Sequence, residues 1–329
     1  MTAFRLTSDL SFALYRLPDD DSVKCIVHQS PAEGLVNSGF VLAPFLTDYP
    51  EVVIHAEILL ENPHLEWVVD LPPMDLMVSG RADYLQKAAE YVAACKAKLN
   101  KVILSRKKQV IQENFHPLDF FYKLEKFYKS AFVYLCYTPQ YGCWAGATPE
   151  HLLEVKSGKA KTVSLAGTQP SDAYFWSDKE RDEQEWVSVY IRDVLQKRGL
   201  SFIETGPETI QAGKIAHLKS VFEFELPAGE VFPLAKALHP TPAVCGLPKE
   251  TALRFIQEYE GYDRQLYTGY LGPFSTENTS LFVNLRCARL FDDGLELFVG
   301  GGITAASEPH KEWEETELKS KTLLDILEK

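Results

Sequence analysis

The sequence predicts an α+β fold in which antiparallel sheets are covered on one face by helices. Short β-rich runs follow one another with hairpin-like turns between them, such as Asp293-Gly294. Apolar residues at helical spacing occur in separate segments that intervene between these runs. Strands in runs joined by turns, with intervening helices, are typical of antiparallel sheets that bury one face.

The elements of the first half follow from periodicity and from helix or strand breakers. Residues 1–75 alternate short β-rich runs with Pro, Asp and Asn breaks, which predicts sheet; the runs are CIVHQS, GFVLAPF, EVVIHAEILL and LEWVVDL. Apolar residues recur at helical spacing from Ala82 to about Leu99 and predict a helix. Further expected elements are a strand KVILSRKKQVI (101–111), a helix opened by Pro117 at about 117–128, and a strand AFVYLCYTP (131–139).

The second half contains the clearest helix of the chain, at 178–198. Val187, Ile191 and Leu195 fall on one stripe, Asp178 can cap the first turn, and Gly199 ends the helix. The other expected elements are strands HLLEVKSG (151–158) and KTVSLAGT (161–168), a helix at 248–260, strands at 266–274, 280–291 and 295–303, and a closing helix from about Lys311 to Leu327.

Charge and composition restrict the partners. Across 329 residues, Lys+Arg number 34 and Asp+Glu number 46, so the formal net charge is 34 − 46 = −12. We therefore expect no nucleic acid and no membrane as partner, because like charges would have to meet. The six cysteines are scattered without a CxxC pair, as reduced thiols are, and no signal-peptide-like start or long apolar run appears. We expect a cytoplasmic protein; its oligomeric state is open, with a monomer slightly favoured.

Four glutamates form two i,i+3 pairs on separate helices. Glu180 and Glu183 lie in the first two turns of the helix at 178–198, and Glu312 and Glu315 have the same spacing in the closing helix. Two such pairs could converge on one divalent ion, and Mg²⁺ suits a few carboxylates completed by water and substrate oxygens. The alternative is that acidic residues favour helix N-termini through the macrodipole and remain solvated.

Three further charged residues have both a functional and a structural interpretation. Lys101, at the start of a strand, is either a solvated edge charge or a general base, and the latter requires burial or a nearby cation. Glu150 follows the small-residue stretch WAGA, which we expect to be a loop, and is either a general acid or a first-turn glutamate. Arg286 lies inside the expected strand LFVNLRCARL; with Tyr267 on the preceding strand it either clamps a carboxylate or forms an internal salt bridge.

Glycine-rich stretches and a proline loop complete the candidates. LAGTQ (165–169) and VGGGIT (299–304) offer backbone N–H groups to carboxylate or hydroxyl oxygens, although glycine turns between strands are the default explanation. In the rigid loop HPTPAVCGLP (239–248), His239 either organises a site or hydrogen-bonds within the loop. No dinucleotide fingerprint, P-loop, GxSxG elbow or zinc motif is present, which counts against hydrolases and NTPases.

The order and wording of these motifs resemble those of the chorismate-utilising enzyme family from about residue 80 to the end. The motifs are KVILSR, WAGATPE, LAGT, KERDEQEWV, HPTPAVCGLP, LYTGYLGP, NLRCARL, VGGGI and EWEETELK. That family includes isochorismate synthases, anthranilate and aminodeoxychorismate synthase large subunits, and salicylate synthases. The resemblance implies one chorismate-binding domain over residues 1–329, made of two α/β halves, each an antiparallel sheet with helices outside, and an active site between them. Residues 1–75 resemble the variable N-terminal sheet region of the family only loosely.

The same resemblance implies a metal site. Mg²⁺ is the implied ion, with Glu183 and Glu315 as the nearest ligands and Glu180 and Glu312 as their partners, directly or through water. The metal would neutralise the ring carboxylate of chorismate. Gln184 departs from the pattern, because many relatives have histidine there, and the departure could alter metal affinity.

Substrate-binding positions are implied in the same way. Arg286 and Tyr267 match positions that hold the enolpyruvyl carboxylate of chorismate, aided by backbone N–H groups of the Gly301-Gly302 loop. The full implied set is Thr168, His239, Tyr267, Arg286, Gly301, Gly302 and Lys319.

Similarity to isochorismate synthases within the family implies the reaction. Ala166 stands where aminodeoxychorismate synthases often carry a nucleophilic lysine, and the loop HPTPAVCGLP resembles the isochorismate synthase version, so water is the expected nucleophile. Lys101 would take a proton from the water that attacks ring C2, and Glu150 would protonate the departing C4 hydroxyl, in a reversible reaction. The alternatives are a salicylate synthase, which adds pyruvate elimination, and a catalytically silent homologue that binds an anionic metabolite or a partner protein. Isochorismate feeds menaquinone, salicylate and catecholate siderophore synthesis, so the pathway stays open.

Overall fold

Six helices and two large antiparallel sheets are found in residues 3–29, 37–76, 80–170, 172, 175–212, 215–227 and 229–328, which are the residues that a computed structural model of the chain describes. The helices are α1 (Arg81–Ala97), α2 (Pro117–Phe127), α3 (Asp178–Lys197), α4 (Val231–Leu238), α5 (Lys249–Tyr259) and α6 (Pro309–Leu327). Five of them confirm predicted helices to within a few residues, and α4 was not predicted. None of these helices has the length and apolar character needed to cross a membrane.

The first sheet has nine strands and carries the expected strand 101–111. Its strands, in spatial order, are β15 (Gly246–Leu247), β8 (Lys101–Ile111), β19 (Gly294–Ile303), β18 (Cys287–Phe291), β10 (Gly142–Thr148), β9 (Phe132–Thr138), β2 (Ser11–Arg16), β3 (Lys24–His28) and β6 (Ile58–Glu61). Every neighbouring pair is antiparallel.

The second sheet has eight strands and is also antiparallel throughout. In order they are β13 (Phe202–Ala212), β14 (Ile215–Glu225), β12 (Lys159–Pro170), β11 (His151–Lys156), β17 (Asn278–Val283), β16 (Tyr270–Ser275), β4 (Ser38–Ala43) and β5 (Val52–His55). A small parallel pair, β1 (Phe4–Thr7) with β7 (Leu65–Val68), completes the described strands. The α+β prediction is confirmed, and strands from the first 75 residues lie in both large sheets.

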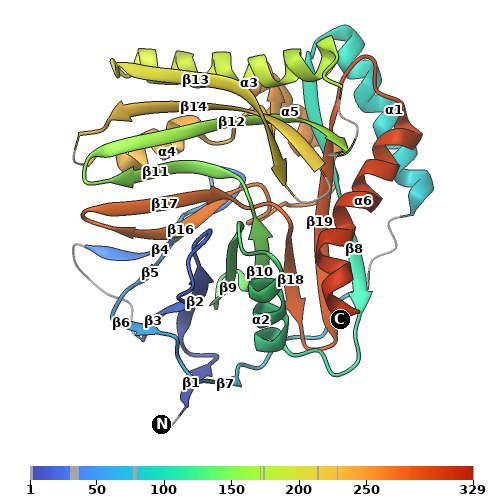
Figure 1. The fold of residues 1–329 in the computed structure, drawn as a ribbon. Coiled ribbons are helices and arrows are strands. Elements are labelled where there is room, and N and C mark those ends of the chain that lie inside the picture. Colours follow the sequence, from blue (N-terminus) through green and yellow to red (C-terminus); the bar gives the residue numbers. More distant parts are fainter. Residues whose placement is uncertain are drawn as a thin grey trace.

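Apolar cores hold these layers together. Between the two sheets, the rings of Phe132 on β9 and Phe282 on β17 stack with their centroids 4.1 Å apart. A second core lies between the nine-stranded sheet and helices α2 and α6, and a third lies between the eight-stranded sheet and helices α3 and α4. A fourth surrounds β8 between α1 and α5. Helices therefore cover the outer faces of both sheets (Figure 1).

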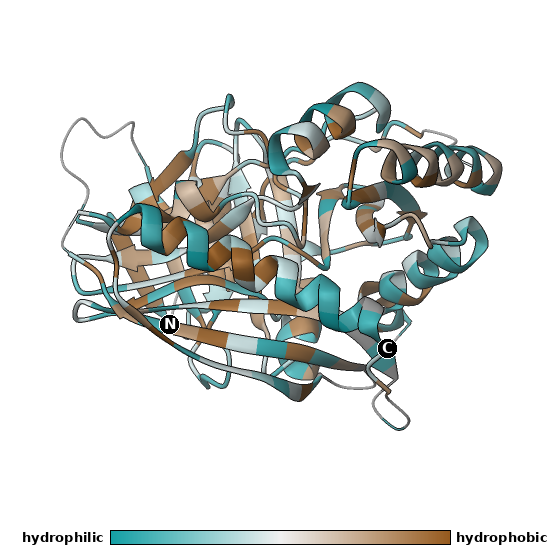
Figure 2. Ribbon diagram, turned by 90° about the horizontal axis from the view of Figure 1, so that it is seen from above, coloured by the Kyte–Doolittle hydropathy of each residue, from teal (hydrophilic) through white to brown (hydrophobic). Residues whose placement is uncertain are grey.

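The helices follow from local sequence signals. Ser177 is the N-cap of α3, and the Glu180 carboxylate accepts a hydrogen bond from its backbone N–H, which forms a capping box. Val187, Ile191 and Leu195 form the buried stripe of the same helix. Figure 2 shows hydrophilic and hydrophobic residues mixed along the helices, as expected for helices that bury one side.

Three glycine-rich or small-residue stretches lie in strands: the predicted strands 161–168 and 295–303 are confirmed, and the stretch WAGA, which was expected to be a loop, is a strand as well. WAGAT lies in β10, LAGTQ in β12 and VGGGI in β19. Gly146 explains the first case, because a Cβ there would lie 2.9 Å from the Arg286 carbonyl oxygen and 3.0 Å from the Tyr134 ring. The small residues thus permit close packing against a neighbouring strand and ring.

Candidate active site

Lys101 begins β8 and points into the protein. Its side chain is 6% exposed, and its Nζ lies 3.4 Å from Glu183 Oε2 on α3. Gly302 on the neighbouring strand provides the space, because a Cβ there would lie 2.5 Å from Lys101 Cε and 3.2 Å from its Nζ. Lys101 is therefore a buried amine and not a solvated edge charge.

Glu150 lies between β10 and β11, where the chain passes from one sheet to the other. Its carbonyl oxygen accepts a hydrogen bond from Val283 N at 2.9 Å, which fixes the backbone. Burial raises the pKa of its carboxyl group from 4.5 to about 7, although the charges of Arg286, Lys101 and Lys319 act in the opposite direction. Glu150 thus lies within electrostatic reach of three cations and exchanges its proton near neutral pH.

Arg286 lies between β17 and β18, not inside one long strand at 280–291 as predicted. Its φ of +49° is a left-handed conformation that breaks the strand, and its carbonyl oxygen accepts a hydrogen bond from Ala147 N at 3.1 Å. Burial lowers the pKa of its partly buried guanidinium. Within the described part of the chain, this guanidinium makes no ion pair or hydrogen bond, so the internal salt bridge considered above is absent there.

Tyr267 lies in the turn before β16 and not on a strand. Its buried ring stacks on Phe298 with centroids 5.3 Å apart, and its hydroxyl oxygen would lie 3.0 Å from a Cβ at Gly300. Burial raises the pKa of this phenol, which keeps it protonated. The contacts described for Tyr267 do not join it to Arg286.

Glu312 and Glu315 on α6 converge over Gly301 of β19. A Cβ at Gly301 would lie 3.3 Å from Glu312 Oε2 and 3.6 Å from Glu315 Oε1. Lys319 Nζ lies 2.6 Å from Glu315 Oε1 and donates a hydrogen bond to the Gly300 carbonyl oxygen at 2.9 Å. The predicted i,i+3 pair therefore shares one face of α6, directed at the glycine strand.

The second glutamate pair, on α3, has protein partners of its own. Glu180 accepts hydrogen bonds from Ser177 N at 3.0 Å, from Ser177 Oγ, and from Gln169 Nε2 at 3.1 Å. Burial opposes ionisation of Glu180, but these hydrogen bonds outweigh it and lower the pKa of the carboxyl group. Glu183 has Lys101 as its neighbour.

The donor set at α6 is suited to Mg²⁺. This ion commonly binds one or two protein carboxylates and completes its shell with water and substrate oxygens. Glu312 and Glu315 supply two converging carboxylates. Among the described residues, however, no group of three or more His, Cys, Asp or Glu side chains is close enough to hold a metal ion. The gathering of all four glutamates, Glu180 and Glu183 included, around one ion stays a prediction.

His239 is buried at the end of α4. Its Nε2 lies 3.0 Å from the Phe45 carbonyl oxygen and 3.2 Å from that of Pro44, and burial lowers its pKa to about 4. As a neutral ring, His239 donates a hydrogen bond to these carbonyl groups and thereby joins the proline loop to the segment after β4. Its predicted contact with substrate stays a prediction. The side chain of Thr168 lies outside the described residues.

Gln184 faces the eight-stranded sheet. Its Nε2 lies 3.2 Å from Ser164 Oγ, 3.0 Å from Ser188 Oγ and 2.8 Å from Ser220 Oγ, and its side chain is buried. The amide therefore donates hydrogen bonds to serine hydroxyls beneath α3. The predicted effect of Gln184 on metal affinity stays a prediction.

Sequence reasoning missed His217 on β14. This buried residue stands opposite the bulge of β12 at Gly167, and its Nδ1 lies 2.8 Å from the Gly167 carbonyl oxygen. Burial lowers the pKa of His217, and the charges of Arg286 and Lys319 lower it further. A histidine in the run IAHLKS (215–220), which pairs with the strand that contains LAGT, was the available signal.

Residues from both sheets and two helices thus form one charged site. Lys101, Arg286 and Lys319 supply positive charge around a carboxyl group, Glu150, that holds a proton near neutral pH. Such a set can bind a small molecule with more than one carboxylate and can move protons to and from it.

The comparisons with known proteins name the family. Residues 78–328 match the chorismate binding enzymes, and the chain belongs to this family. Isochorismate synthase EntC of Escherichia coli (strain K12) is 35% identical over 199 residues, which cover 56% of this chain and 51% of the relative. The salicylate biosynthesis isochorismate synthase of Pseudomonas aeruginosa is 31% identical over 268 residues, which cover 77% of this chain and 56% of the relative. The chain thus spans about half the length of these curated relatives.

Solved structures share the fold. MenF, the menaquinone-specific isochorismate synthase from Escherichia coli, superimposes with a TM-score of 0.83 at 18% identity, over 98% of this chain and 89% of that one. DhbC from Bacillus anthracis has a TM-score of 0.79 at 24% identity, over 96% of each chain. The implied fold of the chorismate-binding enzymes is confirmed.

Proposed function

We propose that this protein is an isochorismate synthase, which converts chorismate to isochorismate reversibly. The family binds chorismate, and relatives at about one-third identity are named isochorismate synthases. The observation that carries the proposal is a buried amine, Lys101, whose charge acts on the carboxyl group of Glu150, together with the pKa of about 7 of that carboxyl group.

Lys101 is the proposed general base. Its Nζ takes one proton from a water molecule as the water oxygen forms a bond to ring C2. The amine is held between Gly302 and Glu183, so its position is defined before substrate arrives.

Glu150 is the proposed general acid. As the ring double bonds shift, the C4–oxygen bond breaks, and the Glu150 proton passes to the departing hydroxyl group, which leaves as water. One water is added and one is lost, so the reaction runs in both directions without a covalent intermediate. Because a raised pKa keeps part of the carboxyl groups protonated near pH 7, turnover is expected to fall as the pH rises through about 7.

Arg286 is the proposed partner of the enolpyruvyl carboxylate. Its guanidinium is partly buried and has no partner among the described side chains, so a bound carboxylate would satisfy its donors. Tyr267 and the backbone of Gly301 and Gly302 are proposed to border the same carboxylate. Mg²⁺, held by Glu312 and Glu315 with Glu180 and Glu183, would neutralise the ring carboxylate. Chorismate and isochorismate are the proposed ligands, with Lys319, His239 and Thr168 as further proposed contacts.

A product assay tests the proposal. Purified protein is incubated with chorismate and Mg²⁺, and a parallel sample contains EDTA. Chromatography is expected to show isochorismate only without EDTA, and the same mixture when the reaction starts from isochorismate. Salicylate with pyruvate would instead support a salicylate synthase, and calorimetric binding of chorismate without turnover would support a silent homologue. Lys101→Ala is expected to abolish turnover, whereas the exposed Lys96→Ala serves as the matched control.

A further inference from the structure

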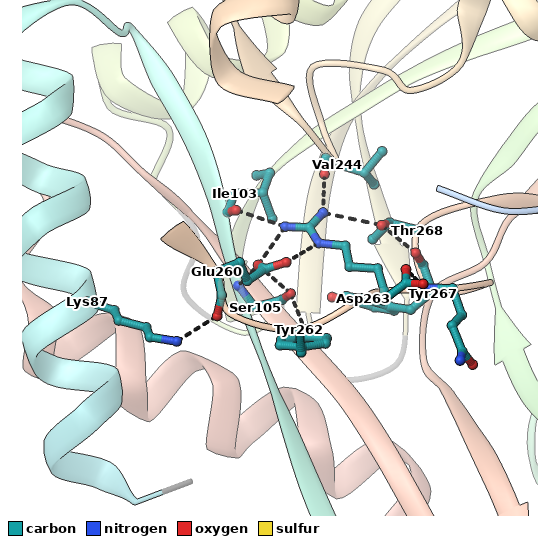
Figure 3. Close-up of polar contacts among 11 residues, drawn as sticks. Lys87, Ile103, Ser105, Val244, Glu260, Tyr262, Asp263, Tyr267 and Thr268 are labelled. Carbon is teal, nitrogen blue, oxygen red and sulfur yellow. Dashed lines mark hydrogen bonds and ion pairs between the residues drawn. The ribbon is translucent and has the colours of Figure 1, made fainter. Parts of the chain in front are cut away.

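A buried ion pair lies at the edge of the nine-stranded sheet, beside the strand that begins with Lys101 (Figure 3). Glu260 follows α5, and Arg264 lies four residues later. Arg264 Nε lies 2.6 Å from Glu260 Oε2, Arg264 Nη2 lies 2.7 Å from Glu260 Oε1, and both side chains are 1% exposed. The proposed chemistry uses neither residue.

This pair completes the hydrogen bonding of β8. The short strand β15 pairs with β8 only at Lys101 and Val102. Beyond that point, Arg264 Nη2 donates to the Ile103 carbonyl oxygen at 3.0 Å, and Ser105 N donates to Glu260 Oε1 at 2.8 Å. Buried backbone groups without partners are costly, so the ion pair acts as a substitute for a neighbouring strand.

The same guanidinium reaches two other segments. Arg264 Nη1 donates to the Val244 carbonyl oxygen of the proline loop at 2.9 Å and to Thr268 Oγ1 at 3.3 Å. Its guanidinium also lies over the Phe45 ring, 4.4 Å from the centroid. All five N–H donors therefore have acceptors, which a lysine could not reproduce.

We propose that Arg264, together with Glu260, is a positioning residue for Lys101. The two hydrogen bonds to β8 are made at the second and fourth residues after Lys101, where no longer strand holds this edge. Loss of the guanidinium frees the start of β8 to shift, and the buried amine then leaves its place beside Gly302 and Glu183. This inference rests on the proposed function, in which Lys101 is the base.

Steady-state kinetics of Arg264→Lys and Arg264→Met test the role. Arg264→Lys keeps a positive charge beside Glu260, so it replaces Arg264→Met in the kinetic test if Arg264→Met does not fold. A displaced base is expected to lower kcat by about 100-fold, with KM for chorismate changed less than about threefold. Thr268→Val, which removes only the contact to the Tyr267 turn, is expected to leave kcat nearly unchanged. A rise in KM with an unaltered kcat in the Arg264 variants would overturn the proposal.

Arg16 provides a matched control for lost stability. It is also fully buried, donates to the carbonyl oxygens of Tyr128 and Lys129 at 2.6 and 2.7 Å, and pairs with Glu125. Arg16→Met is expected to lower the melting temperature much as Arg264→Met does while leaving kcat unchanged below the transition. Equal losses of kcat in both variants would mean that Arg264 acts only through stability.

A labelling experiment separates this inference from the proposed function. Lysine amines are acetylated briefly with acetic anhydride, and the labelled peptides are quantified by mass spectrometry. In Arg264→Lys, acetylation of Lys101 is expected to rise several-fold relative to the exposed Lys96. Unchanged labelling of Lys101 would overturn the positioning role. Increased labelling in a protein whose wild type does not convert chorismate would support the positioning role and refute the proposed function.

Discussion

Glu150→Gln should stabilise the folded protein while removing the proposed catalytic acid. The pKa of the Glu150 carboxyl group is about 7 in the folded protein, against an ordinary 4.5. Since one pKa unit corresponds to about 1.4 kcal/mol, ionising Glu150 in the folded chain costs up to about 3 kcal/mol more than in the unfolded chain. The folded pKa is the higher one, so this contribution to stability is complete below pH 4.5 and is lost as the pH rises through about 7. Glutamine resembles the protonated carboxyl group but cannot ionise, so the Gln variant keeps this contribution to stability as the pH rises.

Thermal unfolding of both proteins from pH 4 to pH 9, without chorismate or Mg²⁺, measures this effect. For a chain of 329 residues, about 3 kcal/mol corresponds to about 4 °C in melting temperature. The variant is expected to match the wild type near pH 4 and to melt about 4 °C higher above pH 7. Chorismate turnover by the variant is expected to be abolished at every pH.

Glu154→Gln is the control of opposite sign. Burial of Glu154 opposes its ionisation, but hydrogen bonds from Lys156 and Lys161 outweigh burial and lower the pKa of this carboxyl group. Its contribution to stability is present above pH 4.5 and is lost as the pH falls, so the Gln variant should melt lower at neutral pH. If Glu150→Gln and the wild type instead showed the same melting temperature across the whole pH range, the account of Glu150 as a partly buried acid that holds its proton would be refuted.

Three other substitutions test the binding side of the site. Arg286→Met removes a guanidinium that has no partner in the described part of the protein, and KM for chorismate is expected to rise about 10- to 100-fold in steady-state assays; an unchanged KM contradicts the assignment. Gly302→Ala places a Cβ 2.5 Å from Lys101 Cε and is expected to lower kcat about tenfold or more, whereas Gly80→Ala, whose Cβ would lie 3.8 Å from Asp83 Oδ2, should not. Glu315→Gln should raise the Mg²⁺ concentration needed for half-maximal rate, measured by titration, and an identical requirement would remove this residue from the metal site.

Periodicity predicted most helices because their signals are local. The stripe of Val187, Ile191 and Leu195 and the N-terminal Pro117 are read within one element, and both helices formed where expected. The reason for the glycines within the predicted strand 295–303 was not visible, because its cause is distant in the sequence. Gly301 and Gly302 lie in a strand whose open faces are filled by Glu312, Glu315 and Lys101, a fact that no local window contains.

The prediction of the site residues depended more on the resemblance to a family than on residue spacing. Lys101, Glu150 and Arg286 come from different elements, and only the fold brings their charges within reach of one another. Their types and positions were implied by motif order, whereas local patterning left each of them with a structural alternative. The left-handed conformation of Arg286 was also beyond prediction, because no sequence signal distinguishes it from a residue within a strand. His217 was missed because its role becomes visible only opposite the bulge at Gly167.

Oxygen tracing tests the central claim, that water adds at C2 while the C4 hydroxyl group leaves. Chorismate is converted in H₂¹⁸O with Mg²⁺, and the products are analysed by mass spectrometry before equilibrium is reached. The account predicts isochorismate that carries one ¹⁸O atom, at C2, and chorismate recovered later with ¹⁸O at C4 through the reverse reaction. Isochorismate without label would show that the hydroxyl group moves within the molecule and would contradict the roles given to Lys101 and Glu150.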